Sequence, residues 1–489
     1  MGAWAGFALP GLDGIVAGVR AETRAPRTLM AVYYDTPDLR LARWGVSLRH
    51  RAGDGTGWTV KLPDGDDGPA LVRRELTFEG PSGIIPDAAA ALVVAYARGA
   101  NMGPVARMRT VRTGVDLLDT EGTRVAEVVD DEVSVLHGGR VAARFRELEV
   151  EIGDRAPDDL LERVVATVRQ AGAGEPDRTT KVVRALGPRA LAPPEIVLAE
   201  LGDKPTAAAL VRETVAASVV RILRHDAGIR IGDDPEDVHQ ARVGTRRLRS
   251  DLRTFAPMLD EAWLTPLREE LKWLAALLGA VRDADVLLDR LRAQTADLPG
   301  PDTAGLAPLL RRLAKQREEG RAALLEAMSG RRYVELLDAL VDAAQSPRYR
   351  AKADRSAVKF VPRLVRRPWK RLRTSVHALP SDPPPEDLHR IRILAKRARY
   401  AADAATPVGG KRARSFAAAL ADLQGVLGEH QDAMVAEAWL RTALADADPA
   451  AARAGAELIA LERADATACR ARWKPVWKKA SDKKLRSWL

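Results

Sequence analysis

The sequence predicts an α+β multidomain protein in which an N-terminal antiparallel β-barrel precedes an all-α domain made of a duplicated helical bundle. Three observations support this fold class. Residues 1–190 contain short β-rich pieces separated by Gly, Asp and Pro turns, whereas residues from about 205 onward carry apolar stripes with a 3.6-residue period. The second region also contains one basic motif twice, which indicates an internal repeat.

Composition limits the class of protein without naming a function. At 489 residues the chain is long enough for two or three domains, and its 46% hydrophobic content is ample for their cores. Basic residues exceed acidic residues by 77 to 67, and the excess is concentrated between Arg348 and Arg373, where eleven basic residues accompany one acid, Asp354. This density predicts a polyanionic partner, with a solvated face in an arginine-rich protein as the alternative interpretation.

Cysteine content and hydropathy indicate a compartment. The only cysteine is Cys469, which gives no disulfide framework and no thiolate metal site and fits a reducing cytoplasm. No stretch reaches the roughly 18 to 20 apolar residues that span a bilayer, and residues 1–20 lack the basic start and unbroken apolar segment of a signal peptide. We therefore expect a cytoplasmic protein without a membrane partner.

The predicted strands of the N-terminal region carry charges of one sign on one face. Strands are expected at 31–36, 46–51, 58–62, 72–78, 105–110, 124–136 and 145–152. Alternation places together Arg49 with Arg51, Thr59 with Lys61, Arg107 with Arg109, and Glu147 with Glu149 and Glu151. A solvent-facing surface is the simpler explanation for any single strand, but four such strands favour a polar lumen.

The chemistry of such a lumen follows from its residue types. Three carboxylates on one face suit a hard divalent cation such as Mg²⁺ or Mn²⁺, which takes oxygen ligands. Arg and Lys across the lumen would bind phosphate oxygens, and a metal bridging those oxygens would neutralise charge and orient a water for in-line attack.

The motifs of this region follow one another in a recognisable order. Residues 5–190 contain, in sequence, YYDTPDLRLARWGVSLRHR, WTVKLP, RREL, RELEVE and TTKVVRAL. As a set they resemble the CYTH domain of the triphosphate tunnel metalloenzymes, which implies an eight-stranded antiparallel tunnel that binds triphosphate-containing substrates with Mg²⁺ or Mn²⁺. The resemblance implies phosphate binding by Arg49, Arg51, Lys61, Arg109 and Lys181, and metal binding by Glu147, Glu149 and Glu151.

The chain departs from that family at its first strand. The family begins with a strand bearing ExExK, and nothing of that form precedes Tyr33 here. We therefore expect a tunnel without its first strand. Two interpretations stay open: the true start lies further upstream, or the barrel lacks one wall and part of its metal site. Only the first leaves a complete site for a metal-dependent triphosphatase.

The helical region begins after a Pro-rich run at 186–196. A helix is also expected at 160–172, before this run. Helix breaks are expected at Gly228–Pro235, Pro299–Pro301, Pro380–Pro385 and Pro407–Gly410. The expected organisation is a barrel over 1–190, a linker over 191–204 and a helical domain over 205–489 with halves of about 205–345 and 346–489.

A basic motif occurs in each half. The first copy carries His239, Arg242, Arg246, Arg249 and Arg253 at i, i+3, i+7, i+10 and i+14, which places them on one helix face. The second copy repeats the spacing with His389, Arg392, Lys396 and Arg399. An LGxxxD element follows each copy, at Leu278–Asp283 and Leu427–Asp432. The two acids are expected to orient neighbouring arginines.

The motifs HxxRVxxRRLR, LLGAVRDADVLL and HxxRIxxKRxRY resemble the CHAD domain, a duplicated all-helical module. The resemblance implies binding of inorganic polyphosphate across a basic surface shared by both halves. That role falls to the nine residues of the two stripes, with Lys272 and Arg282 as further candidates. In the second copy LGEHQDAMV replaces the RDxD pattern. A hydrogen-bonded structural role remains the alternative for His239 and His389.

These observations lead to three functional hypotheses. The first is polyphosphate binding by the helical domain, with a barrel that binds and hydrolyses triphosphate or short polyphosphate, and hence association with polyphosphate granules. The second is a non-catalytic polyphosphate-targeting module with a degenerate barrel. The third is a nucleic-acid-associated or ribosome-associated basic protein, although an aromatic content of 4% gives few platforms for stacking single-stranded bases.

Overall fold

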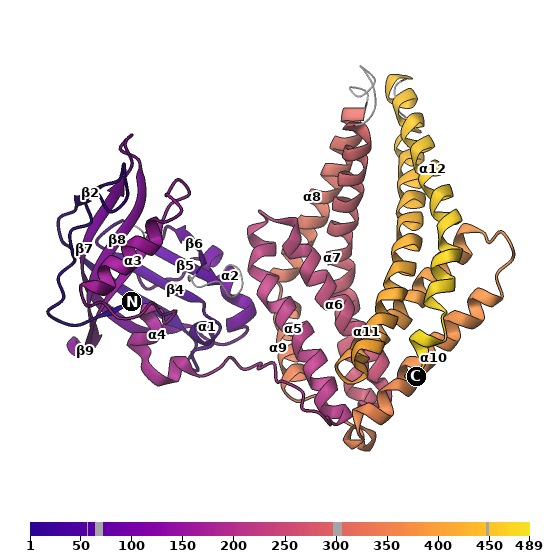
Figure 1. The fold of residues 1–489 in the computed structure, drawn as a ribbon, viewed down its shortest axis with the longest axis horizontal. Coiled ribbons are helices and arrows are strands. Elements are labelled where there is room, and N and C mark those ends of the chain that lie inside the picture. Colours follow the sequence, from indigo (N-terminus) through magenta and orange to yellow (C-terminus); the bar gives the residue numbers. More distant parts are fainter. Residues whose placement is uncertain (56, 64–71, 297–305, 446–448) are drawn as a thin grey trace. The chain divides into compact units, whose positions relative to one another are not determined.

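The computed structural model describes residues 1–55, 57–63, 72–296, 306–445 and 449–489. The chain divides into two compact units, Met1–Pro194 and Glu195–Leu489. The first contains an antiparallel sheet and the second is helical, which confirms the predicted fold class (Figure 1). The division falls inside the segment expected to be a linker.

The N-terminal unit is built on one antiparallel sheet of nine strands. The strands are β1 (Gly2–Ala3), β2 (Arg20–Thr23), β3 (Arg27–Asp35), β4 (Ser47–Ala52), β5 (Gly57–Pro63), β6 (Arg73–Phe78), β7 (Gly103–Leu118), β8 (Arg124–His137) and β9 (Arg140–Ile152). They pair in the order β1-β9-β8-β7-β3-β4-β5-β6, and β2 adds to β7 beyond β3. Among the described residues no ladder joins β6 to β1, so the sheet does not close into a hydrogen-bonded ring.

Apolar clusters hold helices against the long strands β7 and β8. Leu117 and Val128 pack with Leu160 of α3 (Leu160–Gln170), the helix expected at 160–172. Further along the strands, Val133 packs with Val182 of α4 (Lys181–Leu186). The first residue of α4 is Lys181, so this packing places its ammonium group against β8 and β9. Shorter elements of the unit are α1 (Arg40–Arg43), α2 (Asp87–Ala97) and η1 (Gly187–Leu191).

The C-terminal unit consists of long helices. They are α5 (Ala207–Ile231), α6 (Pro235–Phe255), α7 (Glu261–Ala296), α8 (Ala307–Ser329), α9 (Arg331–Gln345), α10 (Ala357–His377), α11 (Pro385–Ala443) and α12 (Pro449–Ala480), with short 3₁₀ turns η2 (Ala256–Met258), η4 (Ala351–Asp354) and η5 (Lys484–Arg486). None of the helices within the described ranges is both long and apolar enough to cross a bilayer.

Three of the four expected helix breaks lie in the described residues. One separates α5 from α6 and another separates α10 from α11. The third is a kink inside α11, where Gly410 has φ 58° and ψ −144° and the helix continues on either side. The break expected at Pro299–Pro301 lies outside the described residues.

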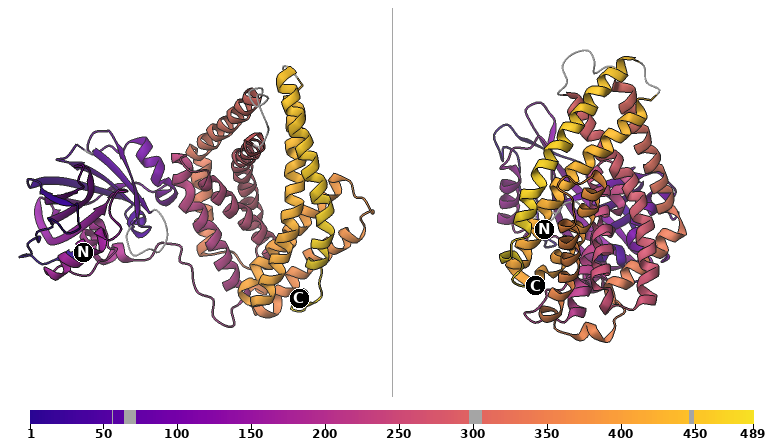
Figure 2. Two further views of the ribbon diagram at one scale, coloured as in Figure 1. Left: turned by 45° about the horizontal axis from the view of Figure 1, so that its top comes forward. Right: turned by 90° about the vertical axis from the view of Figure 1, so that its right-hand side faces the viewer.

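The two halves of the helical unit follow the sequence repeat. Helices α5 and α10 begin at positions 150 residues apart, Ala207 and Ala357. Their first residues are joined to each other's preceding segment by two backbone hydrogen bonds: Ala207 N donates to Arg355 O at 2.8 Å and Ala357 N donates to Pro205 O at 2.9 Å. The first part of α11 corresponds to α6, and its second part, beside α12, corresponds to α7 (Figure 1 and Figure 2). Helices α6 and α11 pack together, so both basic motifs lie at the contact between the halves.

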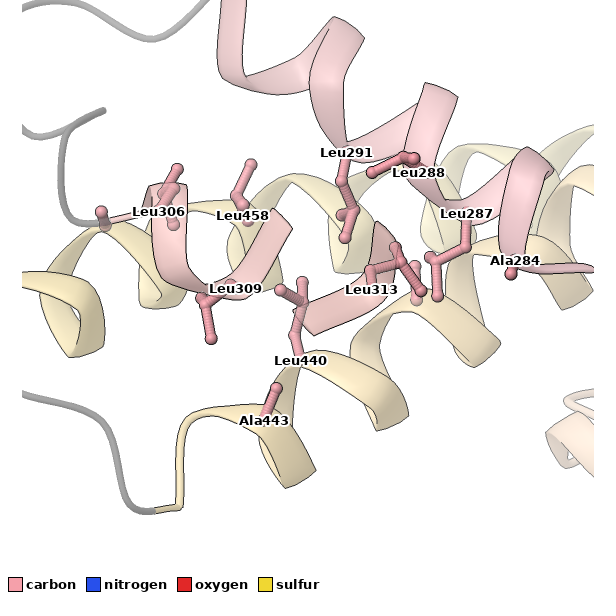
Figure 3. Close-up of a cluster of buried hydrophobic side chains, with 12 residues drawn as sticks. Ala284, Leu287, Leu288, Leu291, Leu306, Leu309, Leu313, Leu440, Ala443 and Leu458 are labelled. Carbon is pink, nitrogen blue, oxygen red and sulfur yellow. The ribbon is translucent and has the colours of Figure 1, made fainter. Parts of the chain in front are cut away.

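A second contact joins the halves through an apolar cluster drawn from α7, α8, α11 and α12 (Figure 3). Leu291 and Leu440 are almost completely buried there. Next to it, Arg290 of α7 donates to the fully buried carboxylate of Glu462 on α12 at 2.6 Å. These contacts fix the spacing of the two basic motifs.

Candidate functional site

One face of the N-terminal sheet gathers charged side chains from six strands. Directly paired residues of neighbouring strands share a face. The pairs Arg112 with Asp131 and Asp131 with Glu147 place β7, β8 and β9 in register on that face. The charged residues of this face include Arg49, Arg51, Lys61, Arg73, Glu75, Arg112, Asp131, Glu147, Glu149 and Glu151, with Arg27, Asp116 and Glu127 further along the same face.

Three of these carboxylates form a compact acidic cluster. Asp131 of β8 and Glu147 and Glu149 of β9 each offer an oxygen, and these oxygens lie within 4.8 Å of one another. Lys181 Nζ lies among them, 2.5 Å from Asp131, 2.9 Å from Glu147 and 3.4 Å from Glu149. Arg112 donates to Asp131 at 2.6 Å and to Glu149 at 3.2 Å.

The structure corrects the expected set of metal ligands. Glu151 is solvent-exposed and lies outside the cluster, whereas Asp131, which the sequence analysis did not select, is fully buried within it. Alternation along β9 indicated only that Glu147, Glu149 and Glu151 share a face. The pairing of Asp131 with Glu147 adds the third carboxylate, and it depends on the register between β8 and β9.

The charges of the acidic cluster depend on one another. Burial raises the pKa of Glu147, while Lys181 acts in the opposite direction. Burial alone would also raise the pKa of Glu149, but the positive charges of Lys181, Arg112 and Lys61 outweigh it and hold that pKa well below its usual range. For Lys181, burial opposes the charged form and the carboxylates outweigh it, so its pKa is raised. Glu149 and Lys181 therefore stay charged at neutral pH, whereas burial works against the charged form of Glu147.

The donor set of the acidic cluster fits a hard divalent cation. All three residues offer carboxylate oxygens, the ligand type that Mg²⁺ and Mn²⁺ prefer. The Oε1 of Glu147 lies 2.9 Å from Lys181 Nζ, so a cation held by these three carboxylates would take over an oxygen that now pairs with the ammonium group.

Cations line the same face on β4, β5 and β6. Lys61 Nζ lies 2.6 Å from Glu75, and Arg51 lies 2.5 Å from Asp54. The buried Arg49 contacts Tyr33 Oη and Glu75 at 3.5 Å each, and its Nε has no hydrogen-bond partner in the described part of the chain. These side chains form a wall of positive charge that is only partly neutralised.

Arg109 does not belong to this wall. It lies on the opposite, solvent-exposed face of β7, paired with Met30, which is 43% exposed. Arg112, three residues later, faces the acidic cluster instead. For Arg109 the structure therefore agrees with the simpler interpretation of a solvent-facing strand.

In the helical unit, α6 and α11 bring five cations together. We call this set the central basic cluster, and its members are Arg242, Arg246, Arg392, Lys396 and Arg399. All five side chains are half-buried. Burial and then the charges of the four arginines lower the pKa of Lys396 to about 7. The guanidinium carbon of Arg246 lies 5.8 Å from the centre of the Tyr400 ring.

The positive charge of this cluster is sparsely compensated. Arg242 donates to Asp283 at 2.8 Å, and Arg399 lies 3.4 Å from Asp403. Arg246, Arg392 and Lys396 form no ion pair with any described residue, and the buried Nε atoms of the two arginines lack hydrogen-bond partners there. The carboxylate of Asp432 lies near Arg392, which counteracts the rise that burial causes in the pKa of Asp432. Asp283 orients Arg242 as expected from the LGxxxD element.

The two histidines flank the cluster in different surroundings. His389 Nδ1 lies 2.6 Å from Gln431 Oε1, which matches the hydrogen-bonded structural role considered above. Burial and then the charge of Arg282, with smaller effects of Arg246 and Arg242, lower the pKa of His239. His239 is therefore neutral at neutral pH in the ligand-free protein.

The remaining candidates lie elsewhere. Burial and then Arg268 of α7 lower the pKa of Arg249, with Glu269 acting in the opposite direction. Burial, then Arg397 of α11 and Arg268, lower the pKa of Arg253. Lys272 is exposed and lies 3.4 Å from Glu269, the acid whose charge also acts on Arg249. Arg268 belongs to no repeated motif and gave no sequence signal.

Comparison with known proteins gives a match for each unit. The CYTH domain family matches residues 10–184 and the CHAD domain family matches residues 213–441. Two proteins of Mycobacterium tuberculosis, Uncharacterized protein Rv2226 of strain H37Rv and Uncharacterized protein MT2285 of strain CDC 1551, are each 32% identical over 455 residues, which covers 88% of this chain and 85% of theirs.

Two solved structures are also similar. PptA from Streptomyces chartreusis is 25% identical with a TM-score of 0.48, and the match covers 56% of this chain and 99% of that one. The CHAD domain from the plant Ricinus communis is 29% identical with a TM-score of 0.47, and the match covers 59% and 96%.

Proposed function

The chain belongs to the family of proteins that join a CYTH domain to a CHAD domain, and from this premise we propose that it binds inorganic polyphosphate through its helical unit. The observation that carries the proposal is the central basic cluster. Both sequence repeats contribute to it, and three of its cations, Arg246, Arg392 and Lys396, form no ion pair within the described residues, with Asp432 as the acid near Arg392.

The physical argument concerns unmet charge. Like charges in a half-buried site repel one another, and here the repulsion is large enough to bring the pKa of Lys396 to about 7. A polyanion removes this repulsion. Polyphosphate carries about one charge per unit on a flexible chain, so guanidinium groups can bind successive phosphates without reading a sequence. The same ligand would bring the protein to polyphosphate granules in the cytoplasm.

The test is equilibrium binding of labelled polyphosphate to the full chain at near-physiological salt. In the variant Arg246→Gln/Arg392→Gln, the loss of two charged donors at about 1.5 kcal/mol each lowers affinity on the order of a hundredfold. Lys315→Gln, on an exposed side chain of α8 that pairs with Glu319, serves as the control and leaves affinity within about twofold. Equal displacement by duplex and single-stranded DNA would instead favour a nucleic-acid-associated protein.

A second function concerns the N-terminal unit. We propose that it binds a triphosphate-containing molecule together with Mg²⁺ or Mn²⁺. The supporting observation is the acidic cluster on the same sheet face as Arg49, Arg51 and Lys61. Asp131, Glu147 and Glu149 would hold the cation, which supplies Lewis-acid stabilisation of phosphate charge when bound.

The chain's own cations perform the rest of the task. Arg49, Arg51, Lys61 and Arg112 bind phosphate oxygens, since each already faces the polar side of the sheet. Whether hydrolysis follows is tested by phosphate release from tripolyphosphate with Mg²⁺ or Mn²⁺. Release that Glu149→Gln abolishes would establish a hydrolase. Binding of Mn²⁺ and tripolyphosphate with a rate equal to buffer would establish a non-catalytic module.

A further inference from the structure

Helix α10 exposes a second basic surface, separate from the central basic cluster. We call it the α10 stripe, and its members are Lys359, Arg363, Arg366, Lys370 and Arg373. Their spacing of i, i+4, i+7, i+11 and i+14 confines them to a narrow arc about 21 Å long, given a rise of about 1.5 Å per residue. All five are exposed, as are Arg367 and Arg371 beside them.

None of these seven cations has an acidic partner anywhere in the described ranges of the chain, and residues 357–377 contain no Asp or Glu. Cations three and four positions apart on a helix repel each other. An ordinary solvated face mixes both signs and avoids this repulsion. The stripe therefore carries a cost that no contact within the described protein offsets.

The internal repeat shows that the fold does not require the stripe. Helix α5 is the counterpart of α10, and their buried positions match at an offset of 150 residues, as with Val211 and Val361 or Val215 and Val365. At the five stripe positions α5 carries Ala209, Glu213, Ala216, Val220 and Leu223. The cations are thus a feature of the second half alone, where the face is open to solvent.

The C-terminal segment adds charge next to the stripe. The guanidinium carbon of Arg486 lies 5.0 Å from the centre of the Trp369 ring. Burial and, as a smaller effect, the positive charge of Arg373 lower the pKa of Arg486, so Arg373 is close to it. Trp369 stacks on Trp477 with ring centres 5.4 Å apart, which fixes this segment against α10. Lys483 and Lys484 are exposed and immediately precede Leu485 and Arg486 in the chain, with the exposed Asp482 before them.

The surroundings of the stripe select the kind of polyanion. Val361, Val365 and Trp369 are buried in the protein, so α10 has no apolar face to insert into a lipid surface. No aromatic ring stands exposed among the stripe residues, so single-stranded bases find no stacking platform. A straight row of cations suits a flexible chain of phosphates bound through charge alone.

We propose that the α10 stripe, with Lys483 and Lys484, is a second polyphosphate-binding surface that holds the part of a long chain extending beyond the central basic cluster. This inference rests on the proposed function of the helical unit. α10 packs directly on α11, which carries Lys396, so both surfaces belong to one rigid pair of helices. Two surfaces on one polymer act bivalently, so affinity increases with chain length.

The experiment compares a short oligophosphate with long-chain polyphosphate on the full chain across a range of salt concentrations. The variant Arg363→Gln/Arg366→Gln/Lys370→Gln removes three stripe charges. The control Arg311→Gln/Arg312→Gln/Lys315→Gln removes three exposed charges from α8. All six side chains are exposed, and thermal unfolding verifies that both variants fold as the wild type does.

For long chains we expect the stripe variant to lose at least about tenfold in affinity, and its logarithmic salt slope to become shallower by about two. The α8 control keeps both values, and short-chain binding stays within about twofold in either variant. Equal losses in the stripe variant and the α8 control would overturn the inference while leaving the proposed function intact. Absence of short-chain and long-chain binding to the wild type would remove both.

Duplex DNA provides the remaining comparison. If it binds the full chain as tightly as long polyphosphate and loses the same salt slope in the stripe variant, the surface is a nucleic-acid interface, and its assignment to polyphosphate is overturned. Weak DNA binding that the stripe variant leaves unchanged supports the assignment.

Discussion

Under the proposed function, Lys396 makes the affinity for polyphosphate depend on pH in a defined direction. In the ligand-free protein its pKa is about 7, because burial and four neighbouring arginines disfavour the ammonium form. A bound polyanion favours that form, so binding takes up a proton whenever Lys396 starts neutral. The affinity for polyphosphate is therefore highest below pH 7. It falls as the pH rises toward the higher pKa that Lys396 has in the complex.

The size of the effect follows from the pKa. At pH 6.5 most of Lys396 is protonated, whereas at pH 8.5 about 3% is, so affinity falls about 25-fold over this interval if the pKa in the complex exceeds 8.5. The free energy of unfolding of the free protein changes with pH in the opposite direction to the affinity. Above pH 7 the unfolded chain holds a proton that the folded one lacks, so unfolding free energy rises with pH up to the usual lysine pKa near 10.4.

The assay is a polyphosphate titration at constant ionic strength from pH 6.5 to 8.5, for the wild type and Lys396→Arg. Arginine keeps its charge throughout this range, so the variant should bind at every pH and lose most of the pH dependence. Titration of the terminal phosphates is common to both proteins and cancels in the comparison. Identical pH profiles for the two proteins would refute the reasoning.

Three further outcomes are expected. Arg112→Gln lowers tripolyphosphate affinity about tenfold or more by calorimetry, whereas Arg109→Gln leaves it within about twofold; equal losses would contradict the strand register described above. Leu440→Ala lowers the unfolding free energy in urea by about 2–5 kcal/mol, because it opens a cavity where the two helical halves meet, and a change below about 1 kcal/mol would indicate loose packing there. Glu462→Gln removes the buried partner of Arg290 and costs about 1–3 kcal/mol in the same measurement, so an unchanged midpoint would show that Asp465 alone suffices for that arginine.

The sequence was sufficient for the architecture because each region has a strong local period. Alternating residues indicated the strands, and apolar stripes indicated the helices. The same rule failed to place Arg109, because alternation shows which residues share a face but not which face turns toward the charged side. β7 is long, and its pairing with β3 and β8 determines that Arg112 faces inward and Arg109 outward. Asp131 was missed for the same reason.

The basic stripe on α6 shows a second limit of the same kind. Helical spacing correctly put Arg242, Arg246, Arg249 and Arg253 on one face, but the first and last are separated by about 16 Å along the axis. The partners opposite them therefore differ. Arg242 and Arg246 meet the second repeat's Lys396, while Arg253 meets Arg268, which belongs to no repeated motif, and Arg397, which follows Lys396 in the second motif but is not part of its basic stripe.

The duplication also explains why one cation of the central basic cluster titrates and its counterpart does not. Arg246 and Lys396 occupy equivalent positions 150 residues apart, and burial and like charges lower the pKa of both. Arginine starts so far above neutrality that it stays charged, whereas lysine starts low enough to reach the physiological range. The difference between Arg246 and Lys396 in two similar motifs thus gives a site built from both repeats one proton-dependent member. In the free protein, loss of the Lys396 proton relieves part of the charge repulsion in the central basic cluster. Binding of a polyanion would restore that proton.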